Sequence, residues 1–276
     1  MNNLVKRTIF GFLFVSIMIG ALLWCKYSFA ALVIVMIIGM MAEFYKMTMG
    51  ERYKFSRILA IAAGVILFLF TYAWKGCDMP GKVIILSMVP VFIVMINSLY
   101  VKDKTDFGKF ANIYTGMLYI AVPLATLNLL VFNGECEYSG IMLICFFAIV
   151  WVSDAGAYIF GMALGQKYGK KLFPEVSPKK SWIGFYGGLL AAVLASLALG
   201  KYGFFDFPWY HCVGLAICMN VFGVYGDLIE SQWKRHYLIK DSGNAIPGHG
   251  GLLDRFDSTL LAMPIGIIYL LLFNLL

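Results

Sequence analysis

The chain has 276 residues, of which 61% are hydrophobic and only 13% are charged, and its mean hydropathy is +0.82. Such a composition excludes a soluble globular domain and predicts an all-α, polytopic integral membrane protein. The formal net charge of +7 does not call for nucleic acid as a partner, because the basic residues gather between apolar segments.

Nine apolar segments are long enough to cross a membrane, since a spanning helix needs about 20 apolar residues. We expect these helices at about residues 8–25, 28–47, 56–74, 83–101, 111–132, 139–162, 183–199, 208–229 and 256–275. The first follows Lys6 and Arg7 but lacks a convincing small-residue cleavage site, so we expect it to be retained as an anchor.

The distribution of basic residues predicts that the N-terminus is cytoplasmic. With that orientation, eighteen of the 22 lysines and arginines fall on the cytoplasmic side, and only Lys26, Lys75, Lys82 and Lys201 fall outside. Both polar segments, 163–182 and 230–255, are then cytoplasmic, where nucleotides are found. We further expect the basic residues to attract anionic membrane lipids.

The polar residues divide the chain into two regions. Residues 1–138 offer Glu43 and little else that is polar, so we expect a transmembrane scaffold of about five helices. Residues 139–276 form the predicted catalytic region, with its two cytoplasmic loops. The six cysteines show no metal-ligand spacing, and we interpret them as small apolar side chains.

The sixth expected helix contains Asp154 in an otherwise apolar run. A carboxylate at the centre of a membrane costs about 2.5–3.5 kcal/mol even on lenient insertion scales, so a polar group must face it. A buried contact between helices would satisfy Asp154, and so would a substrate site.

The cytoplasmic segment that follows contains Ser177-Pro178-Lys179-Lys180. Proline fixes the backbone just before two ammonium groups, which could meet a triphosphate, and the serine hydroxyl could bond a phosphate oxygen.

The segment from Gly226 to Ser258 combines acids, bases and glycines between two apolar runs. Its first part predicts the end of a helix with Asp227, Glu230 and Lys234 on one face. A turn at Lys240 and Asp241 then leads into a glycine-rich stretch.

That glycine-rich stretch is His249-Gly250-Gly251, and it precedes the last expected helix. Glycines let backbone N–H groups approach an anion, and a helix N-terminus favours negative charge. Asp254 and Asp257 follow, spaced so that both carboxylates point the same way. Oxygen ligands of this kind predict a Mg²⁺ site.

These residues together favour phosphoryl or nucleotidyl transfer to a lipid, because such chemistry asks mainly for positioning and charge neutralisation. An ion-coupled transporter would also explain Asp154 and the many helices. It predicts paired broken helices and symmetry between the two halves of the chain, and neither is visible in the sequence.

The pattern S-x-x-K-R-x-x-x-x-K-D-S-G-x-x-x-P-G-H-G-G-x-x-D-R-x-D, which extends from Ser231 to Asp257, resembles the signature of the CDP-diacylglycerol synthases, or phosphatidate cytidylyltransferases. The resemblance also covers Trp151 to Gly161 and Ser177 to Trp182. Three positions depart from the family pattern, namely Ala155, Met162 and Ile183.

The resemblance implies that phosphatidic acid and CTP are the substrates, that Mg²⁺ assists, with a second cation as an option, and that the site faces the cytoplasm of a bacterial inner membrane. It implies the following roles: Asp227, Asp254 and Asp257 for the metal; Lys179, Lys180, Lys234 and Arg235 for phosphates; Ser177, His249, Gly250 and Gly251 for the nucleotide; Lys240, Asp241 and Asp154 for substrate or loop support.

Alternatives from related chemistry remain open. A polyprenol kinase or an archaeal-lipid cytidylyltransferase would use the same groups on another lipid. A CDP-alcohol phosphotransferase is disfavoured because its D-G-x-x-A-R motif is absent from the sequence. The oligomeric state is open too, and a homodimer is compatible with the sequence.

Overall fold

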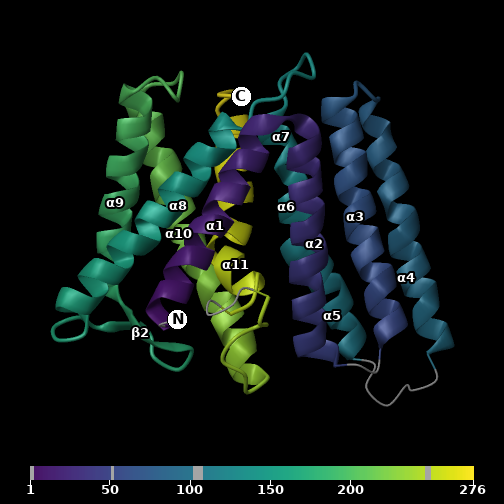
Figure 1. The fold of residues 1–276 in the computed structure, drawn as a ribbon, viewed down its shortest axis with the longest axis horizontal. Coiled ribbons are helices and arrows are strands. Elements are labelled where there is room, and N and C mark those ends of the chain that lie inside the picture. The colour runs from purple at the N-terminus through teal and green to yellow at the C-terminus, as the bar shows by residue number, and fades with distance from the viewer. Residues whose placement is uncertain (1–2, 51–52, 102–107, 246–249) are drawn as a thin grey trace. The chain divides into compact units, whose positions relative to one another are not determined.

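The computed structural model describes the chain apart from residues 1–2, 51–52, 102–107 and 246–249 (Figure 1). Most of the described residues are helical. The first half contains α1 (Asn3–Trp24), α2 (Lys26–Met49), α3 (Lys54–Gly76), η1 (Gly81–Ser87), α4 (Met88–Tyr100), α5 (Lys109–Gly116), η2 (Met117–Ala121), α6 (Val122–Thr126) and α7 (Asn128–Val131). The second half contains α8 (Ile141–Phe160), η3 (Gly161–Gly165), β1 (Lys171–Phe173), β2 (Ser177–Ser181), α9 (Trp182–Lys201), α10 (Trp209–His236) and α11 (Leu253–Leu272).

The prediction of an all-α polytopic membrane protein is confirmed. Within the described residues, eight helical segments are long and apolar enough to cross a membrane, and a shorter apolar helix covers Ile9–Trp24. Several of these segments join two or more elements. The third of the eight, for example, combines η1 with α4 over Gly81–Tyr100.

The first compact unit comprises Met1–Gly140 together with Asp241–Arg255. Here α2 packs against α1, α3 and α5, and α3 also packs against α4 and α6. The core of this unit is built on aromatic rings, among them the fully buried Phe29, Phe44 and Phe68. The segment Asp241–Arg255 lies far along the chain from the rest of the unit, and it becomes important at the site below.

The helical span from Lys109 to Val131 is interrupted. A π-helical turn, η2, separates α5 from α6, and Pro123 stands near the start of α6. Proline has no N–H to donate, and π-helical turns change the direction of a helix locally. The hydroxyl of Tyr45 donates a hydrogen bond of 2.8 Å to the Ile113 carbonyl just before this interruption, and so joins α2 to α5.

We expect Tyr45→Phe to lower the stability of the first unit by about 1 kcal/mol, because Tyr45 is fully buried and the Ile113 carbonyl would lose a donor. The midpoint of thermal unfolding in detergent should fall by roughly 2–4 °C. Tyr100→Phe is the control, since Tyr100 is 78% exposed. Equal midpoints for the two variants would show that the Tyr45 bond contributes nothing.

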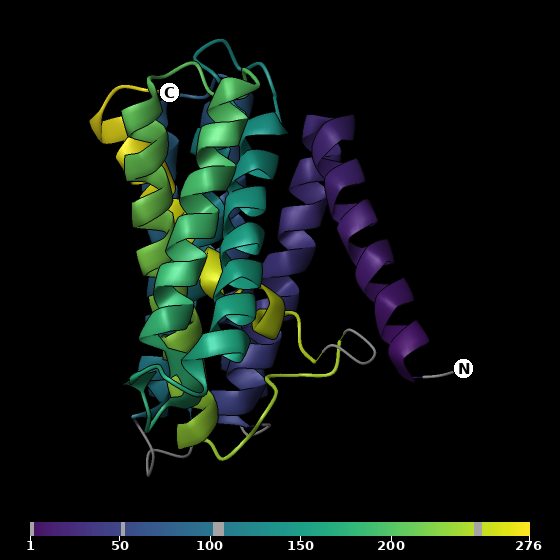
Figure 2. The same cartoon turned by 90° about the vertical axis from the view of Figure 1, so that its left-hand side faces the viewer.

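The second compact unit comprises Ile141–Lys240 and Phe256–Leu276. In it α9 packs against both α8 and α10, and Figure 2 shows these three helices running alongside one another. Small residues allow the close approach of α8 and α9: a Cβ on Gly156 would meet the Gly187 carbonyl oxygen at 2.9 Å. Ser153 of α8 donates a buried hydrogen bond of 2.8 Å to Asn220 of α10.

A short antiparallel hairpin, β1–β2, precedes α9. Lys171 pairs with Ser181 and Phe173 with Ser177. We expected only a cytoplasmic segment here, because three- and five-residue strands are too short to show a two-residue periodicity. Ser181 ends the hairpin and caps α9, since its hydroxyl accepts a hydrogen bond from the Gly184 amide.

Candidate active site

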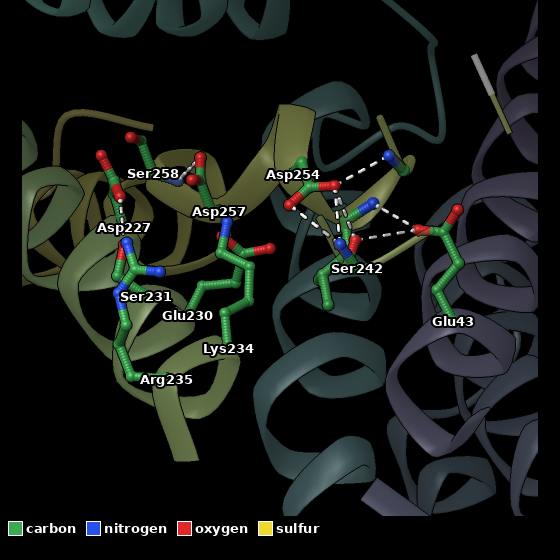
Figure 3. A network of polar contacts seen from close by, with 12 residues as sticks. Glu43, Asp227, Glu230, Ser231, Lys234, Arg235, Ser242, Asp254, Asp257 and Ser258 are labelled. Carbon is green, nitrogen blue, oxygen red and sulfur yellow. Dashed lines mark hydrogen bonds and ion pairs between the residues drawn. The ribbon is translucent and has the colours of Figure 1, made fainter. Parts of the chain in front are cut away.

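The last turns of α10 carry a row of polar side chains. The Ser231 hydroxyl donates to Asp227 Oδ1 at 3.2 Å, and Lys234 Nζ lies 2.5 Å from Glu230 Oε2 (Figure 3). The expected polar face of this helix is therefore present. The helix ends at His236 with basic residues in its last turn, where they complement the helix dipole.

The Glu230 side chain of this row is completely buried, and that of Lys234 is 15% exposed. A buried carboxylate needs a charged partner, and removing either member would leave an uncompensated charge. The Lys234 ammonium group, which the sequence assigned to substrate phosphates, is thus engaged by Glu230 in this structure.

The hairpin supplies a second ion pair to α10. Lys180 Nζ on β2 lies 2.6 Å from Asp227 Oδ2, and Arg235 Nε donates to the Val176 carbonyl at 3.4 Å. Lys179, the neighbour of Lys180, is exposed, while Ser177 is half-buried at the start of β2. The hairpin therefore presents one lysine to a carboxylate of α10 and leaves the next in solvent.

Two further carboxylates of the second unit belong to the same neighbourhood. Asp257 of α11 lies beside the polar row of α10 that carries Asp227 and Glu230 (Figure 3). The Ser258 hydroxyl lies 3.5 Å from Asp154 Oδ1, and the Ser258 amide donates to Asp257 Oδ1 at 2.7 Å. As expected for a carboxylate within a span, Asp154 is faced by polar groups.

The helices approach closely at this point because of Gly226, directly before Asp227. A Cβ at Gly226 would collide with the carbonyl oxygen of Asp257, so only glycine lets α10 and α11 lie this near to each other. The sequence Gly226-Asp227 thereby brings the polar row of α10 beside Asp257 and Ser258 of α11.

The chemistry of these side chains fits a divalent cation. The ammonium groups of Lys180 and Lys234 accompany four carboxylates, those of Asp154, Asp227, Glu230 and Asp257. When all six groups are ionised, the set carries a formal charge of −2. Across the part of the chain that the structure describes, no three His, Cys, Asp or Glu side chains form a ready ligand set. Mg²⁺ does not require one, because it commonly binds through one or two carboxylates together with waters and substrate phosphates.

The start of α11 belongs to the first unit, and there Asp254 holds a loop. Its Oδ2 atom accepts hydrogen bonds from the Ser242 amide at 2.9 Å, the Ser242 hydroxyl at 3.0 Å and the Gly251 amide at 2.7 Å (Figure 3). Gly250 adopts φ of +83°, and a Cβ there would lie 2.9 Å from the same oxygen. Carboxylates that bind metals are usually held by such hydrogen bonds.

The other predicted site residues occupy different settings. Lys240 and Asp241 are exposed in the loop after α10, and His249 lies outside the described residues. Leu238, two residues beyond the end of α10, has φ of +54°, so the chain turns sharply before it reaches Lys240. Of the three expected metal ligands, Asp254 belongs to the first unit, and Asp227 and Asp257 belong to the second.

Sequence reasoning missed one participant, Glu43 of α2. Its carboxylate accepts hydrogen bonds from the amides of Leu252 and Leu253 at 3.0 and 2.9 Å, and from the Ser242 hydroxyl at 3.4 Å. The available signal was its position, since a carboxylate within an apolar helix must find a partner. The partner itself could not be predicted, because about 200 residues separate the two segments.

These observations define an integral membrane protein whose acid and lysine cluster, at the ends of apolar helices, suits the handling of phosphates at a membrane. Comparison with known proteins agrees. Residues 5–273 match the model of the family described as the cytidylyltransferase family.

Three relatives illustrate this similarity. The phosphatidate cytidylyltransferase of Bacillus subtilis (strain 168) is 30% identical over 283 residues, which cover 99% of this chain and 100% of the relative. Those of Staphylococcus aureus (strain COL) and Staphylococcus epidermidis (strain ATCC 12228) are each 36% identical over 175 residues, which cover 63% of this chain and 64% of the relative. The chain belongs to the cytidylyltransferase family, which confirms the resemblance found in the motif from Ser231 to Asp257.

Proposed function

We propose that this chain is a membrane-embedded nucleotidyltransferase that converts CTP and phosphatidic acid into CDP-diacylglycerol and pyrophosphate. The observation that carries the proposal is the cluster of Asp227, Asp257 and Lys180, in a chain that matches the cytidylyltransferase family over almost its whole length. The names of the relatives supply the identity of the two substrates.

In this reaction, an oxygen of the lipid phosphate forms a bond to the α-phosphorus of CTP. The bond from that phosphorus to the oxygen bridging the α- and β-phosphates breaks, and pyrophosphate leaves with the electron pair. The nucleophile needs no dedicated base, because the second pKa of a phosphomonoester is about 6 and the lipid phosphate is largely dianionic near neutral pH. The residues of the cluster then act by holding and neutralising charge.

Asp227 and Asp257 are the residues of the second unit that would hold Mg²⁺, and Asp254 is the third ligand that the family motif suggests. When bound, Mg²⁺ supplies charge neutralisation to the phosphates during the transfer. The Lys180 ammonium group, which lies against Asp227, would meet the triphosphate, and the exposed Lys179 would add a second positive charge from the same hairpin. Asp154 supports the cluster from α8 through Ser258.

The positive-inside distribution supports a cytoplasmic position for this cluster, in a bacterial inner membrane, where CTP is available and the lipid substrate lies in the inner leaflet. The basic residues of the hairpin would also hold anionic headgroups near the site. Homodimerisation stays a prediction, which the mass of the detergent-solubilised protein would test.

The test is an assay of the purified protein with radiolabelled CTP, phosphatidic acid and Mg²⁺ in mixed micelles. We expect label in a lipid that co-migrates with CDP-diacylglycerol, release of pyrophosphate in equal amount, and loss of both when EDTA removes the metal. No labelled lipid in the presence of Mg²⁺, from protein whose folding is verified, would refute the proposal.

The related alternatives give different outcomes in the same assay. A polyprenol kinase would transfer phosphate from γ-labelled CTP to a polyprenol and would leave phosphatidic acid unchanged. An archaeal-lipid cytidylyltransferase would prefer an ether lipid phosphate with isoprenoid chains. Either result would change the lipid substrate that we propose, whereas the cluster would still be expected to bind the nucleotide.

A further inference from the structure

The residue of greatest interest outside the family motif is Glu43, near the end of the second membrane helix. It lies in the first unit, as does the segment Asp241–Arg255, of which it contacts Ser242, Leu252 and Leu253. A carboxylate in an apolar helix is costly unless donors surround it. Here two adjacent backbone amides donate to it, and the Ser242 hydroxyl, which lies nearer to Asp254, is 3.4 Å away.

Glu43 caps the start of α11. Its Oε1 atom accepts from the Leu252 amide and its Oε2 atom from the Leu253 amide, at 3.0 and 2.9 Å. The first N–H groups of a helix have no partner within the helix, and a negative charge is favourable there. Glu43 thus acts as a capping group supplied by another helix.

The backbone around Glu43 is shaped to admit its carboxylate. A Cβ on Gly243 would collide with Glu43 Oε1, and a Cβ on Gly251 would lie 2.6 Å from Glu43 Oε2. Gly39, one turn earlier on α2, leaves room for the Leu252 side chain, which a Cβ there would meet at 2.8 Å. Gly251, which we expected to help admit a phosphate, therefore also makes room for a carboxylate of the protein.

Glu43 and Asp254 accept hydrogen bonds from different backbone amides of this segment. Asp254 takes the amides of Ser242 and Gly251, Glu43 takes those of Leu252 and Leu253, and the Ser242 hydroxyl lies between the two carboxylates (Figure 3). The position of Asp254 therefore depends on the loop, and the loop is fastened to α2 by Glu43.

We infer that Glu43 is a positioning residue: it fixes the loop and the first turn of α11 so that Asp254 is held in place for the reaction. This inference rests on the proposed function, in which Asp254 is a metal ligand. It also assigns the amides of Leu252 and Leu253 to Glu43, so a triphosphate bound at those two amides would first have to displace it.

The contact itself can be tested without any activity, by hydrogen–deuterium exchange of the full-length protein in detergent. Glu43→Gln keeps the shape of the side chain but replaces one accepting oxygen with an NH₂ group, which cannot accept from an amide. We expect exchange to accelerate about tenfold or more at whichever of the Leu252 and Leu253 amides is left without an acceptor, the scale of one hydrogen bond to a charged group. Lys46→Gln, which removes an exposed charge from the same helix, should leave it unchanged.

The role in the reaction is tested by the dependence of turnover on Mg²⁺ concentration. For Glu43→Gln we expect the half-saturating concentration to rise and kcat/KM for CTP to fall, each by about tenfold, the scale seen when a group supporting a metal ligand is removed. Glu43→Ala should have a larger effect than Glu43→Gln. A side chain that only filled space would give a glutamine variant equal to the wild type.

Two results would overturn the inference. Unchanged exchange at Leu252 and Leu253 in Glu43→Gln would refute the contact. Faster exchange with normal turnover and a normal response to Mg²⁺ would refute the positioning role. If the wild-type protein itself transferred no cytidylyl group, the proposed function would fail and the role in transfer would fall with it, whereas the exchange experiment would still decide whether Glu43 fastens the loop.

Discussion

Replacing Asp227 with asparagine is expected to slow cytidylyl transfer by about a hundredfold or more, the scale on which one electrostatic stabiliser acts in an active site. Asparagine keeps the volume of the side chain and an oxygen for the Ser231 hydroxyl. It removes the negative charge that lies 2.6 Å from the Lys180 ammonium group and that would bind the metal. Initial rates with labelled CTP, at saturating phosphatidic acid, measure the loss.

Exchanging the charges of Asp227 and Lys180 tests whether these two residues contribute to catalysis or only to stability. The double variant Asp227→Lys with Lys180→Asp restores opposite charges at the two positions, so its thermal midpoint should recover relative to the single changes, but its turnover should not. Recovery of turnover would show that Asp227 and Lys180 serve only as an ion pair. Asp206→Asn is the matched control, because this carboxylate is exposed in the loop between α9 and α10.

The membrane helices could be predicted from the sequence because each depends on a local property, a run of about 20 apolar residues. The interruptions within them could not. The π-helical turn at Met117–Ala121 lies within an apolar segment, and only Pro123 hinted at a change in direction. The hairpin around Ser177 escaped prediction because its strands are short and its stability comes from contacts with α10.

The polar face of α10 could be predicted for the same reason, since the positions of Asp227, Glu230 and Lys234 follow from helix geometry alone. Which charges pair with one another could not. Lys234 has an acid one turn earlier and binds Glu230, whereas Lys180 reaches Asp227 across 47 positions of sequence. Pairings of the second kind depend on tertiary packing, and Glu43 with the start of α11 is the extreme case.

Asp257→Asn is expected to have the second large effect. It should lower the turnover, but it should not lower the thermal stability in the absence of a metal ion. Burial first, and the like charges of Asp227, Glu230 and Asp154 second, make an ionised carboxylate costly at position 257 in the absence of a cation, and a neutral asparagine avoids that cost. Asparagine still offers an oxygen to the Ser258 amide. We therefore expect a thermal midpoint equal to or above that of the wild type in EDTA, together with a loss of turnover of about a hundredfold or more.

Added Mg²⁺ should distinguish the two proteins further. A cation that binds only the folded state stabilises it by about 2.7 kcal/mol at a hundred times its dissociation constant, so the wild-type midpoint should rise with Mg²⁺ concentration. The midpoint of Asp257→Asn should rise less, because one of the carboxylates that attract the cation is gone. If instead the variant were less stable than the wild type in EDTA and responded equally to Mg²⁺, Asp257 would be a structural residue.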